Sequence, residues 1–177
     1  KSVIFLGCGG SQAAISTGKY LLDSEAKGIG TQVYNSDEFL HAMPRSLDGR
    51  CLCIVCSLKA TPETVDAVRW ANAAGAVTVA LTGSMQTGMA KVGQYVVTYS
   101  SGDRQVYSQA NQAQVLRICF ELLRQFEGWG PYGAAMAGFD ALDGLTARAK
   151  EALLPDARLF AETYRDDGMF YVIGAGP

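Results

Sequence analysis

The chain has 177 residues and a formal net charge of −2, with 15 basic and 17 acidic residues. That length fits one domain with a substantial core, and 49% hydrophobic against 18% charged residues is ordinary for a globular enzyme. No basic run marks a nucleic-acid surface, and the longest apolar runs have the length of strands, too short to span a membrane. Five cysteines in this length do not form a disulfide framework, so we expect reduced core thiols and a cytoplasmic protein.

The first half of the chain alternates strand patterns with helix patterns. Apolar runs rich in β-branched residues predict strands at 2–7, 31–36, 51–57, 76–82 and 94–100. Helices are expected between them, one capped by Ser11 and another by Thr61, with Pro62 at its first position. Strands separated by helices imply right-handed crossovers. We therefore predict an α/β fold, a three-layer αβα sandwich around a five-stranded parallel sheet, with further helices at the C-terminus.

The second half carries helical patterns. Residues 105–126 repeat apolar side chains at helical spacing. After a glycine-rich break, a second helical region reaches about Tyr164 and is expected to be interrupted by Pro155. We therefore assign residues 1–130 to the α/β domain and residues 131–167 to a helical linker.

The end of the chain repeats its beginning. "VIFLGCGG" at 3–10 and "FYVIGAGP" at 170–177 both have four apolar residues, then glycine, a small residue and glycine. So short a repeat can arise by chance, because a strand followed by glycine is common in α/β proteins. The alternative is that residues 168–177 are the first strand of a second, truncated copy of the domain. On that interpretation the terminal segment, with its strand pattern at 169–173, should not pair beside the first strand at the centre of the sheet.

The glycine turn after the first strand is a candidate ligand site. A dinucleotide-binding fold requires G-x-G-x-x-G after that strand and an acid at the end of the second. Gly7 and Gly9 fit this motif, but Gln12 occupies its third position. A Walker phosphate loop is excluded because no G-K-[ST] occurs at its spacing. We therefore expect no nucleotide cofactor.

Hydroxyl side chains follow the first and third strands, at the edge where open α/β sheets bind ligands. Ser11 follows the first strand, and "CSLKATPET" places Ser57, Lys59 and Thr61 between the third strand and a helix N-terminus. Hydroxyls and backbone N–H groups at such termini suit a compact phosphate monoester. Ser11 and Thr61 could equally be plain helix caps, which would leave the function open.

The motifs "GCGGS", "YNSDEF" and "S-x-K…T-P-E-T", followed by "GAVTVALT", resemble those of a sugar isomerase (SIS) domain over residues 3–100. Within that superfamily the chain looks most like the first half of the double-domain fructosamine-6-phosphate deglycases. One departure is that Ala60 stands where the family has glycine, in a loop one residue shorter. Either this loop is tighter, or Ser57 does not reach the phosphate. The resemblance implies phosphosugar binding by Gly9, Ser11, Ser36, Ser57, Lys59 and Thr61.

The resemblance also implies an activity. The full protein would cleave or isomerise a ketosamine or hexose 6-phosphate. The alternatives are an aldose–ketose or amino-sugar phosphate isomerase and a non-catalytic sugar-phosphate sensor. The family's catalytic glutamate and histidine lie in the second domain, so no catalytic residue is assigned in this chain. Association into a homo-oligomer through SIS domains is implied as well.

Two residue types could suggest other chemistry. His41, the sole histidine, follows the second strand with no partner placed by a motif, so we expect it at a helix end or on the surface. Cys51 and Cys53 should share one face of a core strand, and no second Cys or His pair completes a tetrahedral zinc set. No metal site is expected.

Overall fold

A parallel β-sheet forms the centre of the molecule, a computed structural model in which residues 1–174 are described. Its five strands lie in the order β2-β1-β3-β4-β5, and every neighbouring pair is parallel. The predicted five-stranded parallel sheet is therefore confirmed. The strands are β1 (Ser2–Gly7), β2 (Gly30–Asn35), β3 (Cys51–Ser57), β4 (Val77–Thr82) and β5 (Tyr95–Thr98).

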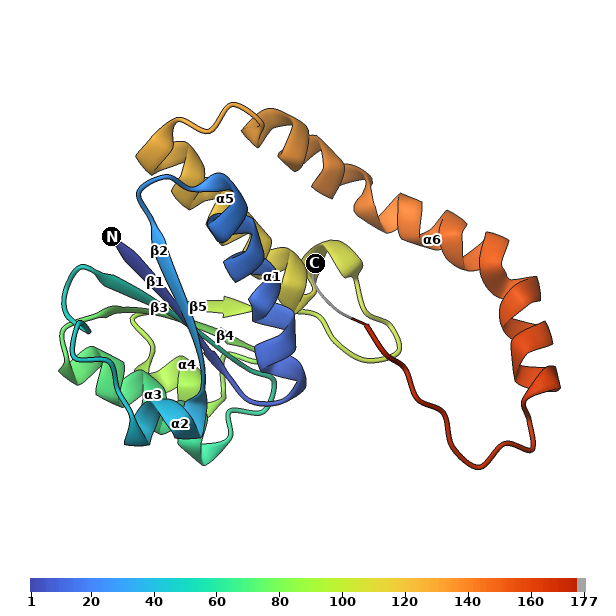
Figure 1. Cartoon of the computed structure of the whole chain (residues 1–177), viewed down its shortest axis with the longest axis horizontal. Coiled ribbons are helices and arrows are strands. Elements are labelled where there is room, and N and C mark those ends of the chain that lie inside the picture. Colours follow the sequence, from blue (N-terminus) through green and yellow to red (C-terminus); the bar gives the residue numbers. More distant parts are fainter. Residues whose placement is uncertain (175–177) are drawn as a thin grey trace.

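Helices cover both faces of the sheet, which confirms the predicted αβα sandwich. Figure 1 shows α1 and α5 on one face and α2, α3 and α4 on the other. A sixth helix, α6, lies against α5 and then leaves the domain. The helices are α1 (Gly10–Glu25), α2 (Ser36–His41), α3 (Pro62–Ala73), α4 (Gly88–Val92), a single 3-10 turn η1 (Tyr107–Gln109), α5 (Asn111–Glu127) and α6 (Tyr132–Thr163).

The central strand β1 supplies both apolar layers. Ile4 and Leu6 pack in the layer under α2 and α3, whereas Val3 and Phe5 pack in the layer under α1 and α5. All four side chains are buried. Because a parallel strand covered on both faces has no solvent side, its sequence is a continuous apolar run and shows no alternation.

The helix starts differ in part from the prediction. Gly9 is the N-cap of α1, so the expectation that Ser11 caps this helix is wrong, and Ser11 is its second residue. Gly9 has φ 53, a left-handed conformation that glycine adopts without steric cost, so the chain can turn earlier. Thr61 is the N-cap of α3 with Pro62 next, as predicted. Its hydroxyl, however, bonds the Thr64 hydroxyl at 2.9 Å and no backbone N–H.

The helical second half also differs from the prediction in detail. The helix expected from residue 105 begins at Asn111, after the η1 turn. The expected interruption at Pro155 is wrong, because α6 continues through it as one helix. A proline removes one backbone hydrogen bond from a helix, and the exposed position of Pro155 leaves its ring free of tertiary packing. As Figure 1 shows, the C-terminal half of α6 projects away from the domain.

The terminal segment lies outside the sheet. Residues 168–174 form no strand and are exposed. Both neighbours of β1 are strands of the first half, β2 and β3, so the prediction that the terminal segment does not pair beside β1 is confirmed. Residues 175–177 of the proposed repeat lie outside the described residues. The division into a domain at 1–130, a linker at 131–167 and the start of a second domain at 168–177 stays a prediction.

Candidate functional site

The loops that follow β1, β2 and β3 meet at the carboxyl edge of the sheet. Gly7 at the end of β1 lies opposite Asn35 at the end of β2. The thiol of the next residue, Cys8, lies 3.6 Å from the Asn35 Oδ1 atom. On the other side, Gly7 lies opposite Cys56 near the end of β3, the strand that leads into α3. The turn after β1 and the N-terminus of α3 are therefore neighbours, as the parallel sheet requires.

The turn after β1 requires glycine at position 7 and leaves open space beside Gly9 and Gly10. A Cβ atom added at Gly7 would lie 3.0 Å from the backbone nitrogen of Gln12 and 3.3 Å from the carbonyl oxygen of Cys56. A side chain there would push α1 away from the sheet. Gly9 and Gly10 are exposed, and a Cβ at either would meet nothing within 4 Å. The N-terminus of α1 is thus open to a ligand at this edge.

Ser11 lies among neutral hydrogen-bonding groups. Its half-buried hydroxyl lies near the Cys56 thiol and the Tyr99 hydroxyl, and it contributes to the pKa of both groups. Burial raises the pKa of the Cys56 thiol and the pKa of Tyr99, so both groups keep their protons at neutral pH. Protonated thiol and phenol groups are hydrogen-bond donors without negative charge. The surroundings of Ser11 therefore suit an anion.

The loop between β3 and α3 is closed by its own hydrogen bonds. The buried Ser57 hydroxyl accepts a hydrogen bond from the backbone N–H of Thr61 at 3.4 Å. Ala60 between them has φ 56, the left-handed conformation that the resembled family fills with glycine. Holding an alanine there costs roughly 1–2 kcal/mol. The Ser57 hydroxyl is therefore engaged inside the loop, and whether it also reaches a phosphate stays a prediction.

Lys59 and Ser36 differ in how accessible they are. Lys59 is exposed and takes part in none of the ion pairs found within residues 1–174, so its ammonium group can face a ligand. Ser36, the first residue of α2, is fully buried, and its hydroxyl has no hydrogen-bond partner in the described part of the chain. A ligand would reach it after a movement of α2. Ligand contact by the six predicted residues stays a prediction. Five of them, all except Ser36, lie in or directly beside the turns that follow β1 and β3.

Sequence reasoning missed Asn35 and Tyr99 at this edge. Asn35 caps α2 by accepting a hydrogen bond from the Asp37 backbone N–H at 3.0 Å. The sequence carried a signal for this cap, because asparagine before a Ser-Asp-Glu run is typical of a helix start. Tyr99 follows β5 and is buried. No local pattern places its hydroxyl near Ser11, because that contact depends on how α1 packs on the sheet.

The two candidate acid–base groups near these loops are poorly suited to proton transfer. The pKa of Glu63 is lowered, first by the Thr61 hydroxyl, then by its own backbone N–H, with Cys8 contributing less. Its place in the first turn of a helix favours the same direction. His41 is the last residue of α2, with 79% of its side chain exposed, 3.8 Å from Asp37. The predicted helix-end histidine is confirmed.

Comparison with known proteins identifies the fold. No family model matches the chain. The chain is 32% identical, over 98% of its length, to fructosamine deglycase FrlB of Bacillus subtilis strain 168. The crystal structure of a candidate phosphosugar isomerase from Bacillus subtilis is 32% identical and matches 97% of the chain with a TM-score of 0.90. The sugar isomerase domain of an RpiR transcription factor from Sphaerobacter thermophilus is 22% identical and has a TM-score of 0.55. The match covers 79% of the present chain and 78% of the transcription factor chain. The chain folds as a sugar isomerase (SIS) domain.

The match covers a part of the larger relatives. The SIS domain described here spans 53% of the fructosamine deglycase and 52% of the Bacillus subtilis crystal structure. The resemblance that "GCGGS" and "S-x-K…T-P-E-T" indicated is therefore confirmed at the level of fold and relatives. The likeness to the transcription factor domain supports the fold alone, because that identity is below 25%.

Four of the five thiols of the SIS domain are buried. Cys51 and Cys53 pack in the same core layer, as predicted from their spacing on β3. Burial raises the pKa of Cys53 to about 12, so this thiol is protonated and unreactive at neutral pH. Within residues 1–174, no three or more His, Cys, Asp or Glu side chains are grouped to hold a metal ion. None of the helices in that range combines the length and the apolar character of a membrane span.

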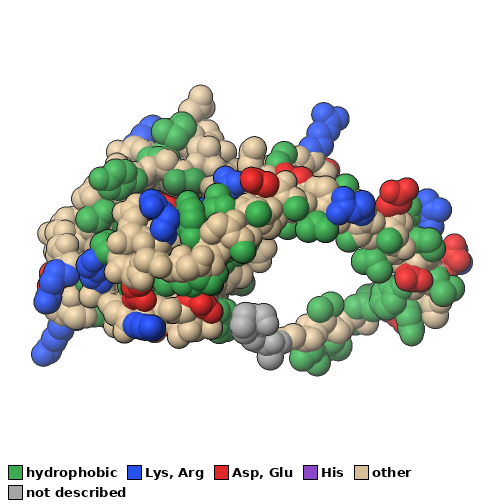
Figure 2. Space-filling view, turned by 90° about the horizontal axis from the view of Figure 1, so that it is seen from above, with side chains coloured by type: hydrophobic (Ala, Val, Ile, Leu, Met, Phe, Trp, Pro, Cys, Tyr) green, Lys and Arg blue, Asp and Glu red, His purple; other side chains and the backbone are tan. Residues whose placement is uncertain are grey.

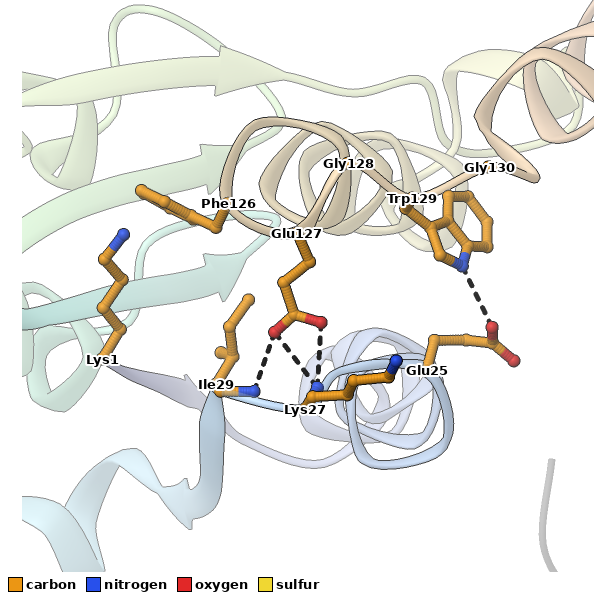
Figure 3. Close-up of a pocket in the computed structure, with 10 residues that line it drawn as sticks. Lys1, Glu25, Lys27, Ile29, Phe126, Glu127, Gly128, Trp129 and Gly130 are labelled. Atoms are coloured by element: carbon orange, nitrogen blue, oxygen red, sulfur yellow. Dashed lines mark hydrogen bonds between the residues drawn. The ribbon is translucent and has the colours of Figure 1, made fainter.

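A cavity of about 720 Å³ lies at the opposite end of the SIS domain, where β1 starts and where α1 and α5 end (Figure 3). The Glu127 carboxylate there accepts hydrogen bonds from the backbone N–H groups of Lys27 and Gly28, at 2.8–3.1 Å. Glu25 accepts one from the Trp129 indole at 3.0 Å. Lys1 and Lys27 line the cavity as well, and both of its carboxylates are already engaged by groups of the domain.

The Glu127 contacts predict a pH-dependent contribution to stability. The backbone N–H of Lys27, followed by that of Gly28, lowers the pKa of Glu127 from its usual 4.5. A carboxylate whose pKa is lower in the folded state stabilises that state at any pH above its pKa in the unfolded chain. This stabilisation is lost as the pH falls through the pKa of the folded state. The melting temperature of Glu127→Gln should therefore lie below that of the parent at pH 7 and converge with it below about pH 3. Glu162→Gln on the exposed side of α6 is the control. A difference independent of pH would contradict the assignment.

Proposed function

We propose that this SIS domain binds the phosphate of a sugar 6-phosphate and belongs to an enzyme that cleaves or isomerises a ketosamine or hexose 6-phosphate. The observation that carries the proposal is that two hydroxyl-bearing helix N-termini, with Ser11 on α1 and Thr61 on α3, follow the adjacent parallel strands β1 and β3 at one edge of the sheet. The 32% identity to a fructosamine deglycase over 98% of the chain supports the same function. An aldose–ketose or amino-sugar phosphate isomerase is the alternative reaction on the same ligand class.

The proposed site uses groups that favour a dianion. The N-termini of α1 and α3 carry unpaired backbone N–H groups and partial positive charge. Lys59 adds a full positive charge from an exposed position, which offsets the ionised Glu63 beside the same loops, and the protonated Cys56 and Tyr99 near Ser11 carry no charge. A phosphate fixed at this edge would hold an open-chain sugar extended. Its first two carbons would then be presented to a proton-transferring group in a defined geometry.

Calorimetric titration of glucose 6-phosphate and sorbitol 6-phosphate tests the site. Ser11→Ala and Thr61→Ala should each weaken binding by about 10-fold to 100-fold, the usual worth of a hydrogen bond to a charged group. Ser16→Ala is the matched control, because the Ser16 hydroxyl bonds the Gln12 carbonyl within α1 at 2.9 Å. NAD at millimolar concentration should give no heat. If both site variants bind as tightly as the parent, the assignment of the two loops is wrong.

A second candidate function is a non-catalytic sugar-phosphate sensor. The lowered pKa of Glu63 is compatible with binding without catalysis, because a carboxylate held ionised is a weak base. Both functions share the ligand, so binding does not separate them, whereas release of hexose 6-phosphate by the full-length protein, of which this chain is a part, would. We further propose that the protein acts in the cytoplasm and self-associates. Its five free cysteines, four of them buried, suit a reducing compartment.

A further inference from the structure

The loop between β4 and α4 lies against the loop between β3 and α3. Thr82 at the end of β4 pairs with Ser57 at the end of β3. One residue further on, the backbone N–H of Gly83 donates a hydrogen bond to the Leu58 carbonyl oxygen at 3.2 Å. The first residues of the two loops are thus tied to each other just beyond the sheet, at the edge that carries the proposed phosphate site.

No side chain fits at Gly83. A Cβ atom there would lie 2.7 Å from the Leu58 Cδ1 atom and 2.9 Å from the Leu58 carbonyl oxygen. The φ of Gly83 is not positive, so this position requires glycine because of the close approach and not because of its backbone conformation. The leucine methyl could rotate away from an added side chain, but the carbonyl oxygen belongs to the backbone. A larger residue at Gly83 therefore displaces the start of the β3–α3 loop.

The β4–α4 loop is held at both of its ends. The hydroxyls of the buried Thr82 and of Thr87 are hydrogen-bonded to each other at 3.0 Å, and Thr87 caps α4 by accepting from the Ala90 backbone N–H at 3.3 Å. A Cβ atom at Gly88 would lie 3.1 Å from a Val65 methyl group, so the start of α4 packs closely on α3. The β4–α4 loop can therefore support the neighbouring β3–α3 loop.

The β3–α3 loop needs this support because its own restraints are weak. Ala60 has a left-handed φ of 56, and a residue other than glycine persists in that conformation only where its surroundings hold it. The hydrogen bond from the Thr61 N–H to the Ser57 hydroxyl spans 3.4 Å, longer than the usual range of about 2.7–3.2 Å. The helix α6 packs on η1 and α5, and Figure 2 shows its projecting half standing apart from the domain across an open space. The contact with Gly83 therefore supplies the second restraint.

We propose that Gly83 is a positioning residue of the phosphate site, whose contact with Leu58 holds the β3–α3 loop in the shape that presents Lys59 and Thr61 to the sugar phosphate. This role rests on the proposed function, and Gly83 need not touch the ligand to fulfil it. The Leu58 carbonyl and the Lys59 N–H belong to one planar peptide unit. A displaced Leu58 carbonyl therefore turns the backbone that leads into Lys59 and disturbs the left-handed turn at Ala60.

A calorimetric titration of Gly83→Ala with sorbitol 6-phosphate tests this role. The variant should raise the Kd about tenfold, which corresponds to the loss of one hydrogen bond to a charged ligand. Gly93→Ala is the matched control, because a Cβ atom there would lie 2.7 Å from the Ala80 Cβ atom and 3.2 Å from the Tyr95 carbonyl oxygen. Gly93 is thus equally crowded, but it precedes β5 at the opposite edge of the sheet. Both variants should lower the midpoint of urea unfolding, whereas the Kd of Gly93→Ala should equal that of the parent.

The amide resonances of the ¹⁵N-labelled chain without ligand report on the loop directly. Gly83→Ala should shift the Lys59 and Thr61 amides, and Gly93→Ala should leave them in place. Leu58→Ala is a second variant that spares folding, because Leu58 is 38% exposed. It removes the side chain that packs on Gly83 and should raise the Kd about threefold.

The outcomes separate the role of Gly83 from the proposed function. A parent that binds sorbitol 6-phosphate while Gly83→Ala and Leu58→Ala bind as tightly refutes the positioning role alone. Unshifted Lys59 and Thr61 amides in Gly83→Ala, or an equal loss of affinity in Gly93→Ala, refute it as well. A parent that binds no sorbitol 6-phosphate refutes the proposed function and the positioning role together.

Discussion

A Gly18→Leu variant should lose about 3 kcal/mol or more of its free energy of unfolding. Gly18 lies on the side of α1 that faces α5 and β1. A Cβ atom there would lie 2.9 Å from the Cys119 Sγ atom, 2.9 Å from a Val115 methyl and 3.0 Å from the Phe5 ring. These contacts are too short for a real side chain, and all three partners are buried. A leucine would therefore separate α1 from the sheet and from α5.

Gly138→Leu in α6 is the matched control. A Cβ atom at Gly138 would meet nothing within 4 Å, and the position is exposed. Leucine favours the helix over glycine, so this variant should gain up to about 1 kcal/mol. Urea unfolding of both variants against the parent measures the difference. An equal loss at both positions would mean that the cost comes from the leucine itself and that α1 is not packed as described.

The chain alone should not turn over a fructosamine 6-phosphate, even where it binds the phosphate. A proton shuttle between adjacent sugar carbons needs a group with a pKa near the working pH, and burial is the usual way to raise that of a carboxylate. The Thr61 hydroxyl and the start of α3 instead lower the pKa of Glu63. His41 projects into solvent at the far end of α2, and the carboxylate nearest to it is the exposed Asp37.

An assay for hexose 6-phosphate release measures this expectation. Typical enzymes turn over on the order of 10 times per second, and we expect the chain to be at least about a thousandfold slower. His41→Ala and Glu63→Gln should leave any background rate unchanged. Turnover within a factor of ten of a typical enzyme, abolished by either substitution, would place the chemistry in this domain and reject the inactive interpretation.

The sheet could be predicted from the sequence because its signals are local. β1 and β3 are continuous apolar runs, which parallel strands buried on both faces require. The start of α3 could also be predicted from a local signal, because threonine followed by proline is common at the start of a helix. The bounds of the short helices α2 and α4 were not predicted, since five or six residues show too little periodicity.

Other features depend on geometry that the sequence does not encode locally. Ser11 resembles a cap as closely as Gly9 does, and the left-handed φ of Gly9 decides between them. Residues 169–173 have the composition of a strand but lie beside no sheet edge in the described chain, and a strand needs a partner for its backbone. Cys56 and Tyr99 form the neutral pair near Ser11, and this arrangement arises from packing between β3, β5 and α1.

The most direct test of the proposed phosphate site is a titration of the ¹⁵N-labelled chain with sorbitol 6-phosphate, followed by the backbone amide resonances. If the two helix N-termini hold the phosphate, the largest saturable shifts should appear at residues 9–11 and 57–61. The amides of Lys27 and Gly28 and the Trp129 indole, at the cavity of Figure 3, should stay unchanged. Shifts centred on that cavity, or none at 9–11 and 57–61 under saturating ligand, would contradict the account.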